Sequence, residues 1–406
     1  MTYLNAKKYI SLSPTSQPGQ KINVLTLLER LGNPQRRIKY VRLAGSNGKT
    51  VCAEMLRSIT KCAGFTVGCL RMPVRQEPRE NVCIGESTLS MDEFAAYTES
   101  IKRIAPSLDF VPTKAEILLC IALCAFRDAG CEFCLIESDH FGDDPSIALP
   151  PPFAAVICGT IPNADRTAIS RIRSYICRGI QEIVSAPQDS DAYRIISDTC
   201  YSINCRLSLP SRNQISIDRL TLRSTQFSYK GVPYTLNLCG KFQVSNAVLV
   251  LEVVEMLSRR GYAIPDECVA RGLSCFKLPA KFEVISLSPL MIIDSTHTPV
   301  AISTVCDSLA DFKGQTGSAV RLCLPRGGII SNYINVLEGL GYTVESVFTD
   351  GQTSIDKDIP LHSFATPKAL ARAVLDGLDK NTVLMVSGDY PFVNPVRYEI
   401  LNILGF

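Results

Sequence analysis

Residues 38–50, IKYVRLAGSNGKT, decide the fold of the N-terminal half of the chain. Residues 38–44 alternate apolar and polar side chains, which predicts a strand. Residues 51–64, VCAEMLRSITKCAG, carry apolar side chains at helical spacing and end at Gly64, which predicts a helix with a glycine cap. A strand, a loop of small residues and a helix in this order are typical of the unit that opens a parallel nucleotide-binding sheet.

The loop between these two elements has the composition of a phosphate-binding turn. Small residues at the end of a strand let several backbone N–H groups point toward one anion, and the helix dipole adds partial positive charge there. Lys49 can reach the β- and γ-phosphates, and the hydroxyl of Thr50 can bind magnesium. The predicted nucleotide-binding residues are Gly45, Ser46, Asn47, Gly48, Lys49 and Thr50. The strict Walker pattern has glycine where Leu43 stands, so the alternative is an ordinary glycine turn.

The composition bounds the class of protein. The chain has 406 residues, of which 46% are apolar and 20% charged, so it buries a large core and should form two or three domains. The formal net charge of +3, without a Lys/Arg-rich run, argues against a nucleic-acid-binding protein. No signal peptide is recognised, and no segment reaches the roughly 18 uninterrupted apolar residues of a membrane span. These features predict a cytoplasmic protein.

The 17 cysteines indicate a reducing compartment. Their number is odd, and most lie in apolar runs such as residues 117–126, where they behave as small buried hydrophobic side chains. Cys131 and Cys134 have the spacing of metal ligands. No second pair or histidine cluster completes a site, so a zinc or redox role is the minor alternative.

Beyond the first loop and helix, helical and strand-like stretches alternate, which predicts an α/β sheet covered by helices on both faces. Residues 115–129 have the pattern of an apolar helix, and residues 133–137 and 154–158 that of buried strands. Residues 193–238 contain short β-rich pieces with turn signals and predict a small antiparallel appendage. A long helix is expected at about residues 244–260.

After a proline-containing connection, a second alternation begins and predicts a smaller Rossmann-like sheet. Its expected strands are residues 290–294, 319–324, 343–348 and 382–387. We therefore expect an ATP-binding domain of residues 1–281 and a C-terminal α/β domain of residues 282–406.

Several short sequence motifs, spread over nearly the whole chain, occur in the same order as in a known family. They are LGNPQ at 31–35, GSNGK at 45–49, Pro112-Thr113 with Glu116, LIE at 135–137, GKFQVSNA at 240–247, LPAKFE at 278–283, DSTHTP at 294–299, and Ser387-Gly388 through Arg397. In this order they resemble the folylpolyglutamate and dihydrofolate synthases, relatives of the Mur ligases. The resemblance implies a P-loop-containing Mur-ligase-like central domain with a small β appendage, followed by a Rossmann-like domain.

The resemblance also implies an activity. It is that of an ATP-dependent amide ligase, which activates a folate-type carboxylate as an acyl phosphate and joins it to the amino group of glutamate. ATP and Mg²⁺ would be the cofactors, folate or dihydropteroate and glutamate the substrates, and the protein would be a monomer. The implied catalytic residues are Lys49, Glu137 and His297, and the implied magnesium ligands are Thr50 and Glu137. Gln243, Asn246, Lys281 and Asp294 would bind the nucleotide.

The chain departs from the family pattern at several positions. Met72 stands in place of a serine that binds magnesium, and a thioether is a poor magnesium ligand. The glycine-rich run after the strand-end glutamate is here residues 138–145, SDHFGDDP, and Arg178 replaces a carbamylated lysine. No histidine lies between His140 and His297, so the histidine that contacts a second metal has no counterpart.

These departures leave three functional hypotheses open: a working ligase, a catalytically silent relative that keeps the fold and binds nucleotide or a partner, and a ligase with a changed substrate. His140, Asp143 or Asp144 close to Glu137 would rebuild a magnesium site, and the alternative is a solvated loop. If Glu137 is not a magnesium ligand, it is a solvated residue at the end of a strand. If Asn246 does not bind the nucleotide, it is a polar residue near the start of a helix.

Overall fold

The chain forms two units, each built around a parallel sheet. A computed structural model describes residues 1–15, 23–45, 47–75, 77–138, 145–161, 163, 165–314 and 316–406. Residues Met1–Gln214 and Ser245–Phe276 make the first unit, and residues Ile215–Val244 and Lys277–Phe406 make the second. The predicted boundary at residue 281 stays a prediction, and these units differ from it mainly in where residues 215–244 belong.

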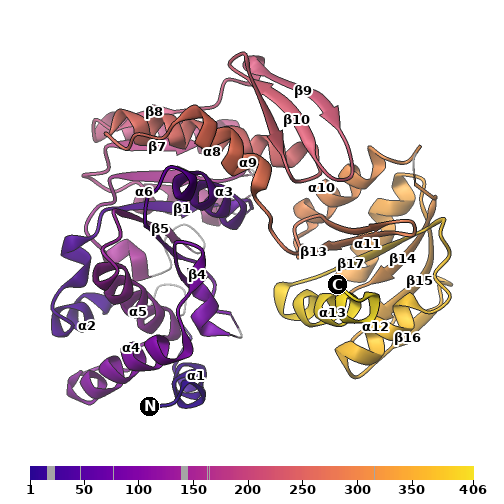
Figure 1. Ribbon diagram of the computed structural model, residues 1–406, viewed down its shortest axis with the longest axis horizontal. Coiled ribbons are helices and arrows are strands. Elements are labelled where there is room, and N and C mark those ends of the chain that lie inside the picture. Colours follow the sequence, from indigo (N-terminus) through magenta and orange to yellow (C-terminus); the bar gives the residue numbers. More distant parts are fainter. Residues whose placement is uncertain are drawn as a thin grey trace. The chain divides into compact units, whose positions relative to one another are not determined.

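The first unit contains an eight-stranded sheet (Figure 1). In spatial order its strands are β4 (Ser87–Thr88), β3 (Val82–Ile84), β2 (Val67–Leu70), β5 (Phe133–Glu137), β1 (Tyr40–Ala44), β6 (Ala154–Ile157), β7 (Glu182–Ser185) and β8 (Arg206–Ser208). The strands from β2 to β8 in this order are parallel, and β3 and β4 extend the edge as antiparallel strands. After β1 the chain first builds one side of the sheet and then, from β6, the other. The carboxyl ends of β5, β1 and β6 therefore flank a topological switch point, where sheets of this type bind ligands.

Helices cover this sheet. They are α1 (Tyr3–Leu12), α2 (Val24–Arg30), α3 (Lys49–Cys62), α4 (Met91–Ile104), α5 (Lys114–Asp128), α6 (Arg166–Tyr175), α7 (Ser190–Ser202), α8 (Lys241–Arg259) and α9 (Asp266–Cys275). Short 3₁₀ turns are Pro34–Arg37, Pro78–Asn81, Ala105–Ser107, Pro145–Ala148 and Arg212–Gln214. The first residues of α8 belong to the second unit, and the helix continues in the first from Ser245.

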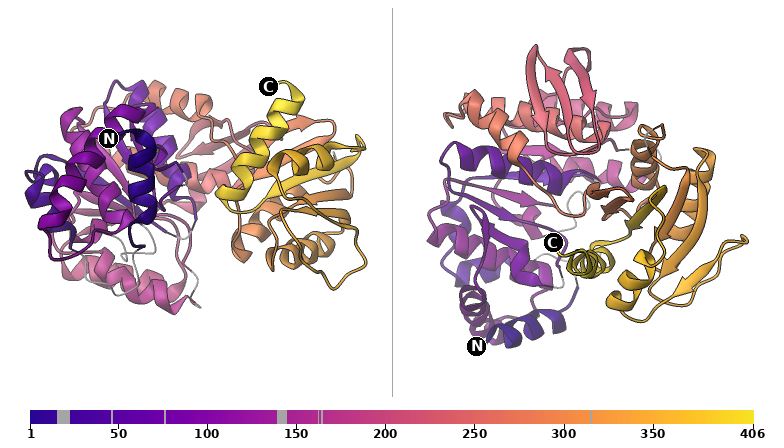
Figure 2. Two further views of the ribbon diagram at one scale, coloured as in Figure 1. Left: turned by 90° about the horizontal axis from the view of Figure 1, so that it is seen from below. Right: turned by 45° about the vertical axis from the view of Figure 1, so that its right-hand side comes forward.

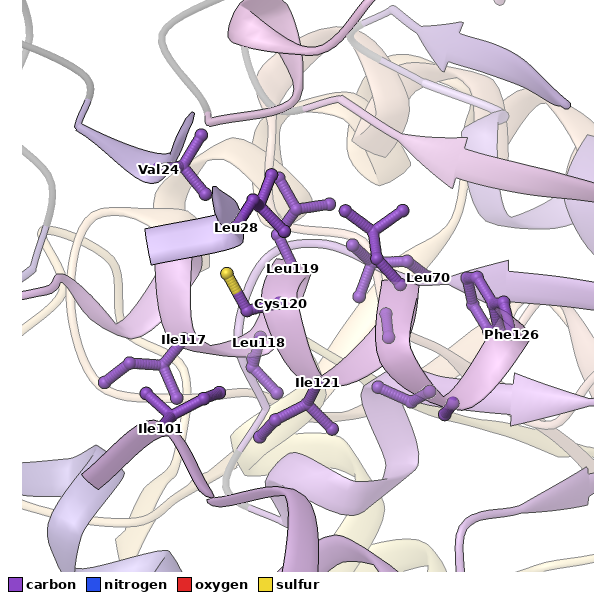
Figure 3. Close-up of a cluster of buried hydrophobic side chains, with 14 of the residues drawn as sticks. Val24, Leu28, Leu70, Ile101, Ile117, Leu118, Leu119, Cys120, Ile121 and Phe126 are labelled. Atoms are coloured by element: carbon purple, nitrogen blue, oxygen red, sulfur yellow. The ribbon is translucent and has the colours of Figure 1, made fainter. Parts of the chain in front are cut away.

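Helix α5 is the centre of the largest described core of the first unit. Its start is a capping box in which the Thr113 hydroxyl accepts the Glu116 N–H and the Glu116 carboxylate accepts the Thr113 N–H. Side chains of α2, α4 and β2 converge on α5 (Figure 3). Because each buried aliphatic side chain contributes about 1.5–3 kcal/mol, this cluster makes a firm base for the strands that carry the site.

The second unit contains a six-stranded sheet with helices on both faces (Figure 2). In spatial order its strands are β12 (Glu283–Leu287), β13 (Leu290–Asp294), β17 (Thr382–Ser387), β14 (Ala319–Cys323), β15 (Thr343–Thr349) and β16 (Leu361–Ser363). All are parallel except β12, which pairs with β13 as a hairpin. Helices α10 (Pro299–Ala310) and α11 (Ile329–Gly339) cover one face, and α12 (Pro367–Leu375) and α13 (Tyr390–Leu404) cover the other.

A three-stranded antiparallel sheet completes the second unit. It consists of β9 (Ile215–Leu220), β10 (Thr225–Tyr229) and β11 (Val232–Leu236). Leu220 and Leu222 pack against the core that α10 and α11 share with the six-stranded sheet.

The predicted α/β fold is confirmed, with strands and helices at the expected places. The prediction of β structure was wrong for residues 193–202, which belong to helix α7. Ala192, Ile196 and Cys200 recur every four residues and are buried on one helix face, which is the pattern of an amphipathic helix. Among the described residues, no helix is long and apolar enough to cross a membrane.

Candidate active site

The loop between β1 and α3 depends on two glycines. Gly45 has a φ of 139°, and a Cβ atom there would lie 1.9 Å from the carbonyl oxygen of Cys158. Gly48 has a φ of 83°, and its Cβ atom would lie 2.5 Å from Oδ1 of Asn246. The loop backbone therefore approaches the end of β6 more closely than any residue with a side chain allows, and the positive φ of Gly48 also favours glycine.

Lys49 begins helix α3 and returns over the loop. Its Nζ donates a hydrogen bond of 2.8 Å to the carbonyl oxygen of Gly45. Its charge is also one of the influences that lower the pKa of Glu137. The structure therefore brings the two predicted catalytic residues Lys49 and Glu137 to the same place, and their catalytic roles remain predictions.

Glu137 ends β5 and is fully buried. Side chains alternate along a strand, so Glu137 shares a face with Phe133 and Leu135, next to helix α3. Its Oε2 accepts the Thr50 hydroxyl at 3.1 Å and the Met72 N–H at 3.4 Å. Among the described residues, its Oε1 has no hydrogen-bond partner.

The electrostatics of Glu137 favour a cation at this position. Burial raises the pKa of Glu137, although the charges of Lys49, Arg71 and Arg75 and the Met72 amide act in the opposite direction. A buried carboxylate oxygen without a partner is costly. A cation beside it would remove that cost.

The oxygen atoms of Glu137 and Thr50 fit magnesium. Magnesium is a hard cation that commonly takes one or two protein carboxylates and completes its octahedron with water and substrate phosphates. In the part of the chain that the structure describes, no three His, Cys, Asp or Glu side chains form a metal-binding group. The predicted residues Ser46, His140, Asp143 and Asp144 lie outside the described residues.

Two further predicted residues lie at the start of helix α8. Asn246 faces the loop, because its side-chain oxygen occupies the space beside Gly48. Gln243 is fully buried in the first turn of the helix. That these two residues face the adenine remains a prediction.

Three predicted residues gather at the carboxyl end of β13 in the second unit. Asp294 is buried, and its Oδ2 accepts the Phe282 N–H at 2.6 Å. Burial raises the pKa of Asp294, and the nearby charge of Lys281 opposes that rise. His297 is exposed just before α10. Their predicted roles toward the nucleotide remain predictions.

Known proteins are similar to this chain in sequence and in fold. No protein-family model matches the sequence. A probable bifunctional folylpolyglutamate synthase/dihydropteroate synthase of Halobacterium salinarum is 27% identical over 73% of this chain, which spans 38% of that relative. A dihydrofolate synthase/folylpolyglutamate synthase of Bacillus subtilis is 22% identical over 92% of this chain and 93% of its own length.

A solved structure agrees with the sequence relatives. The folylpolyglutamate synthase of Mycobacterium tuberculosis, complexed with ADP and AMPPCP, has a TM-score of 0.79 at 19% identity, covering 98% of each chain. The chain is similar in sequence to folylpolyglutamate and dihydrofolate synthases, and it has the fold of a solved folylpolyglutamate synthase.

The turn after β2 carries Met72, one of the departures from the family pattern, and a cluster that the sequence analysis missed. Met72 reaches Glu137 through its backbone N–H. The preceding Arg71 forms an ion pair with Glu54 of α3, and its Nε donates to Glu54 Oε1 at 2.8 Å. Arg57, one helical turn after Glu54, binds the other carboxylate oxygen at 2.5 Å. The signal that could have pointed to this cluster is the string RMPVR itself, because Arg71 and Arg75 flank Met72.

Buried Asn81 shapes the same turn. Its amide nitrogen donates to the carbonyl oxygens of Arg71 and Pro73, each at 2.8 Å, and its Oδ1 accepts the Arg75 N–H at 3.0 Å. By contrast, Arg178 is exposed, and the cations that act most strongly on Glu137 are Lys49, Arg71 and Arg75. The positive charge beside Glu137 therefore comes from Lys49 and from the turn after β2.

Proposed function

We propose that this chain is an ATP-dependent amide ligase that joins glutamate to a folate-type carboxylate through an acyl phosphate. The observation that carries the proposal is the buried Glu137 carboxylate, whose Oε1 lacks a hydrogen-bond partner among the described residues, next to Thr50 at the start of α3. The nucleotide-bound structure of the M. tuberculosis relative supports ATP as the phosphoryl donor. We further propose that the protein is cytoplasmic and monomeric.

In the proposed reaction, a carboxylate oxygen of the folate-type substrate attacks the γ-phosphorus of ATP, and ADP leaves. The amino nitrogen of glutamate then attacks the acyl carbon, phosphate leaves, and the nitrogen loses a proton as the amide forms. Both steps require aligned reactants and neutralisation of charge on the phosphoryl oxygens more than covalent work by the protein.

The residues of the chain would divide this work. The loop amides and Lys49 would bind the triphosphate, and Glu137 with Thr50 would hold magnesium. When bound, magnesium would neutralise phosphate charge. Asp294 is suited to the ribose hydroxyls, and Lys281 and His297 to the nucleotide.

A second candidate function is a nucleotide-binding relative without ligase activity. Met72 favours it, because a thioether is a poor magnesium ligand at a position where the resemblance implies a serine that binds magnesium. A third possibility, a ligase that acts on another carboxylate substrate, is distinguished by the test described next.

The test measures phosphate release from Mg-ATP with glutamate and either dihydropteroate or tetrahydrofolate. Lys49→Ala should lower substrate-dependent release about 10²–10³-fold, because it removes a charge aimed at the transferred phosphoryl group. Lys61→Ala, at the exposed end of the same helix, is the matched control and should keep full release.

The other outcomes separate the candidates. ATP binding without turnover supports the second function. Turnover with other carboxylates only supports a changed substrate. Absence of ATP binding rejects the assignment of the phosphate loop.

A further inference from the structure

Lys281 lies between two residues with unusual backbone conformation. Ala280 has a φ of 54° and Phe282 a φ of 51°, both in the left-handed region. Residues other than glycine adopt this conformation at an energetic cost, and such strain persists only where surrounding contacts hold it, most often at functional sites.

Contacts hold this strained segment on both sides of the lysine. The Ala280 N–H donates to Glu283 Oε2 at 2.8 Å, and the Phe282 N–H donates to Asp294 Oδ2 at 2.6 Å. The Ala280 carbonyl oxygen accepts the Ser295 N–H at 2.8 Å. Each amide that flanks Lys281 is thus bound by its own carboxylate.

The neighbouring side chains anchor the segment further. Ala280 is buried in the core beneath α12 and α13, and Phe282 is buried in the core beneath α10 and α11. These cores lie on opposite faces of the six-stranded sheet. Lys281 is partly exposed between these two buried neighbours, so its direction is set by the backbone that they hold.

Arg397 of helix α13 fixes one of the two carboxylates. Its Nε and Nη2 each donate at 2.6 Å, to Oε2 and Oε1 of Glu283. The side chains are 20% and 22% exposed, so water screens this pair only in part. A bidentate pair fixes the plane of the carboxylate. That plane presents Oε2 to the Ala280 N–H.

We propose that Arg397 is a positioning residue which, through Glu283 and the Ala280 amide, holds Lys281 toward an anionic ligand. This inference rests on the proposed function, in which the anion is the bound nucleotide. Arg397 itself does not touch the ligand. Its contribution is the direction in which the strained segment presents the ammonium group.

Hydrogen exchange tests the structural half of the inference without ligand. Arg397→Ala should accelerate amide exchange at Ala280 at least about tenfold, because the carboxylate that accepts this N–H loses its orientation. The Phe282 amide, bound by Asp294, should keep its rate. Equal acceleration at both amides, or none at Ala280, would overturn the inference.

A double-mutant cycle tests the functional half. Lys281→Ala and Arg397→Ala should each lower kcat/KM for ATP about tenfold to a hundredfold, and the double variant should be no worse than Lys281→Ala alone. Independent, additive losses would mean that Arg397 supports only the fold, and would reject the inference. Lys357→Ala, which removes an exposed ion pair with Glu338 in the same unit, is the matched control and should behave as wild type.

Two further measurements keep the outcomes distinct. Arg397→Lys retains the charge without the bidentate geometry, and should fall between wild type and Arg397→Ala even if the alanine variant folds poorly. If wild type neither binds nor turns over ATP, the proposed function fails, while the exchange experiment still decides whether Arg397 orders the segment.

Discussion

Two glutamates close to the start of α3, the largely buried Glu54 and the fully buried Glu137, differ in how their carboxylate oxygens are bound. Each oxygen of Glu54 is bound by an arginine, Oε1 by Arg71 and Oε2 by Arg57. Burial raises the pKa of Glu54, but the two arginines outweigh it and the net shift is downward. For Glu137 burial outweighs the nearby cations, and the pKa is raised. The difference indicates that Glu54 is saturated by protein contacts, whereas Glu137 keeps an oxygen for a ligand.

The largest effect is expected when the saturated carboxylate is removed. Glu54→Gln leaves two largely buried arginines without their counter-charge, and should lower the free energy of unfolding by about 3–5 kcal/mol. Urea denaturation, with the unfolding of each of the two units fitted separately, would measure this loss of free energy. Glu86→Gln, which breaks the exposed pair with Lys61, is the control and should cost at most about 1 kcal/mol. A cost as small at Glu54 would show that its arginines are already solvated.

The reverse is expected at Glu137. Glu137→Gln should lower substrate-dependent phosphate release about 10²–10³-fold, because one ligand of the predicted magnesium site loses its charge. Its free energy of unfolding without magnesium should not fall, because the substitution removes a buried charge that lacks full compensation. Steady-state kinetics and denaturation on the same sample would check both. A variant that is active but unstable would reverse the comparison and make Glu137 structural.

The raised pKa of Glu137 gives the third prediction. In the folded protein this carboxyl holds its proton to a higher pH than the value of about 4.3 in unfolded chains. Its contribution to stability is therefore complete below that value, and is lost as pH rises through the folded pKa. Wild type without magnesium should lose stability over this range relative to Glu137→Gln.

Magnesium should reverse this loss at neutral pH. At a hundred times its Kd it should raise the free energy of unfolding by about 2.7 kcal/mol in wild type, and by much less in Glu137→Gln. Equal stabilisation of both proteins would place the metal elsewhere. Calcium is the control cation, because it prefers more oxygen ligands than these residues supply.

The local parts of the site were predictable from the sequence. The small residues from Gly45 to Thr50, followed by a helix, determine the loop, and Glu137 ends a short apolar run whose length gives the strand. In both cases the signal lies within a few neighbouring residues. Helix α7 was missed although its buried residues Ala192, Ile196 and Cys200 recur at helical spacing, so this signal was also present in the sequence.

The parts that escaped prediction depend on contacts between distant segments. Glu54 and Arg71 meet because α3 and the turn after β2 lie side by side, which no spacing in the sequence reveals. The left-handed Ala280 and Phe282 carry no signal either, since glycine is the residue expected at positive φ. Their conformation follows from the carboxylates of Glu283 and Asp294, which are supplied by the strands of a hairpin.

The smallest effect on the free energy of unfolding is expected at Arg71, and it tests whether Glu54 and Glu137 act independently. Arg71→Lys keeps the charge beside Glu54 but loses the second of two donors to its Oε1. The free energy of unfolding should fall by about 1 kcal/mol, the net contribution of one hydrogen bond. Phosphate release should change little, because the Met72 N–H that reaches Glu137 is held by backbone contacts through Asn81. A loss of activity as large as that of Glu137→Gln, at preserved stability, would show instead that Arg71 acts on the substrate side, and the two glutamates would then belong to one site.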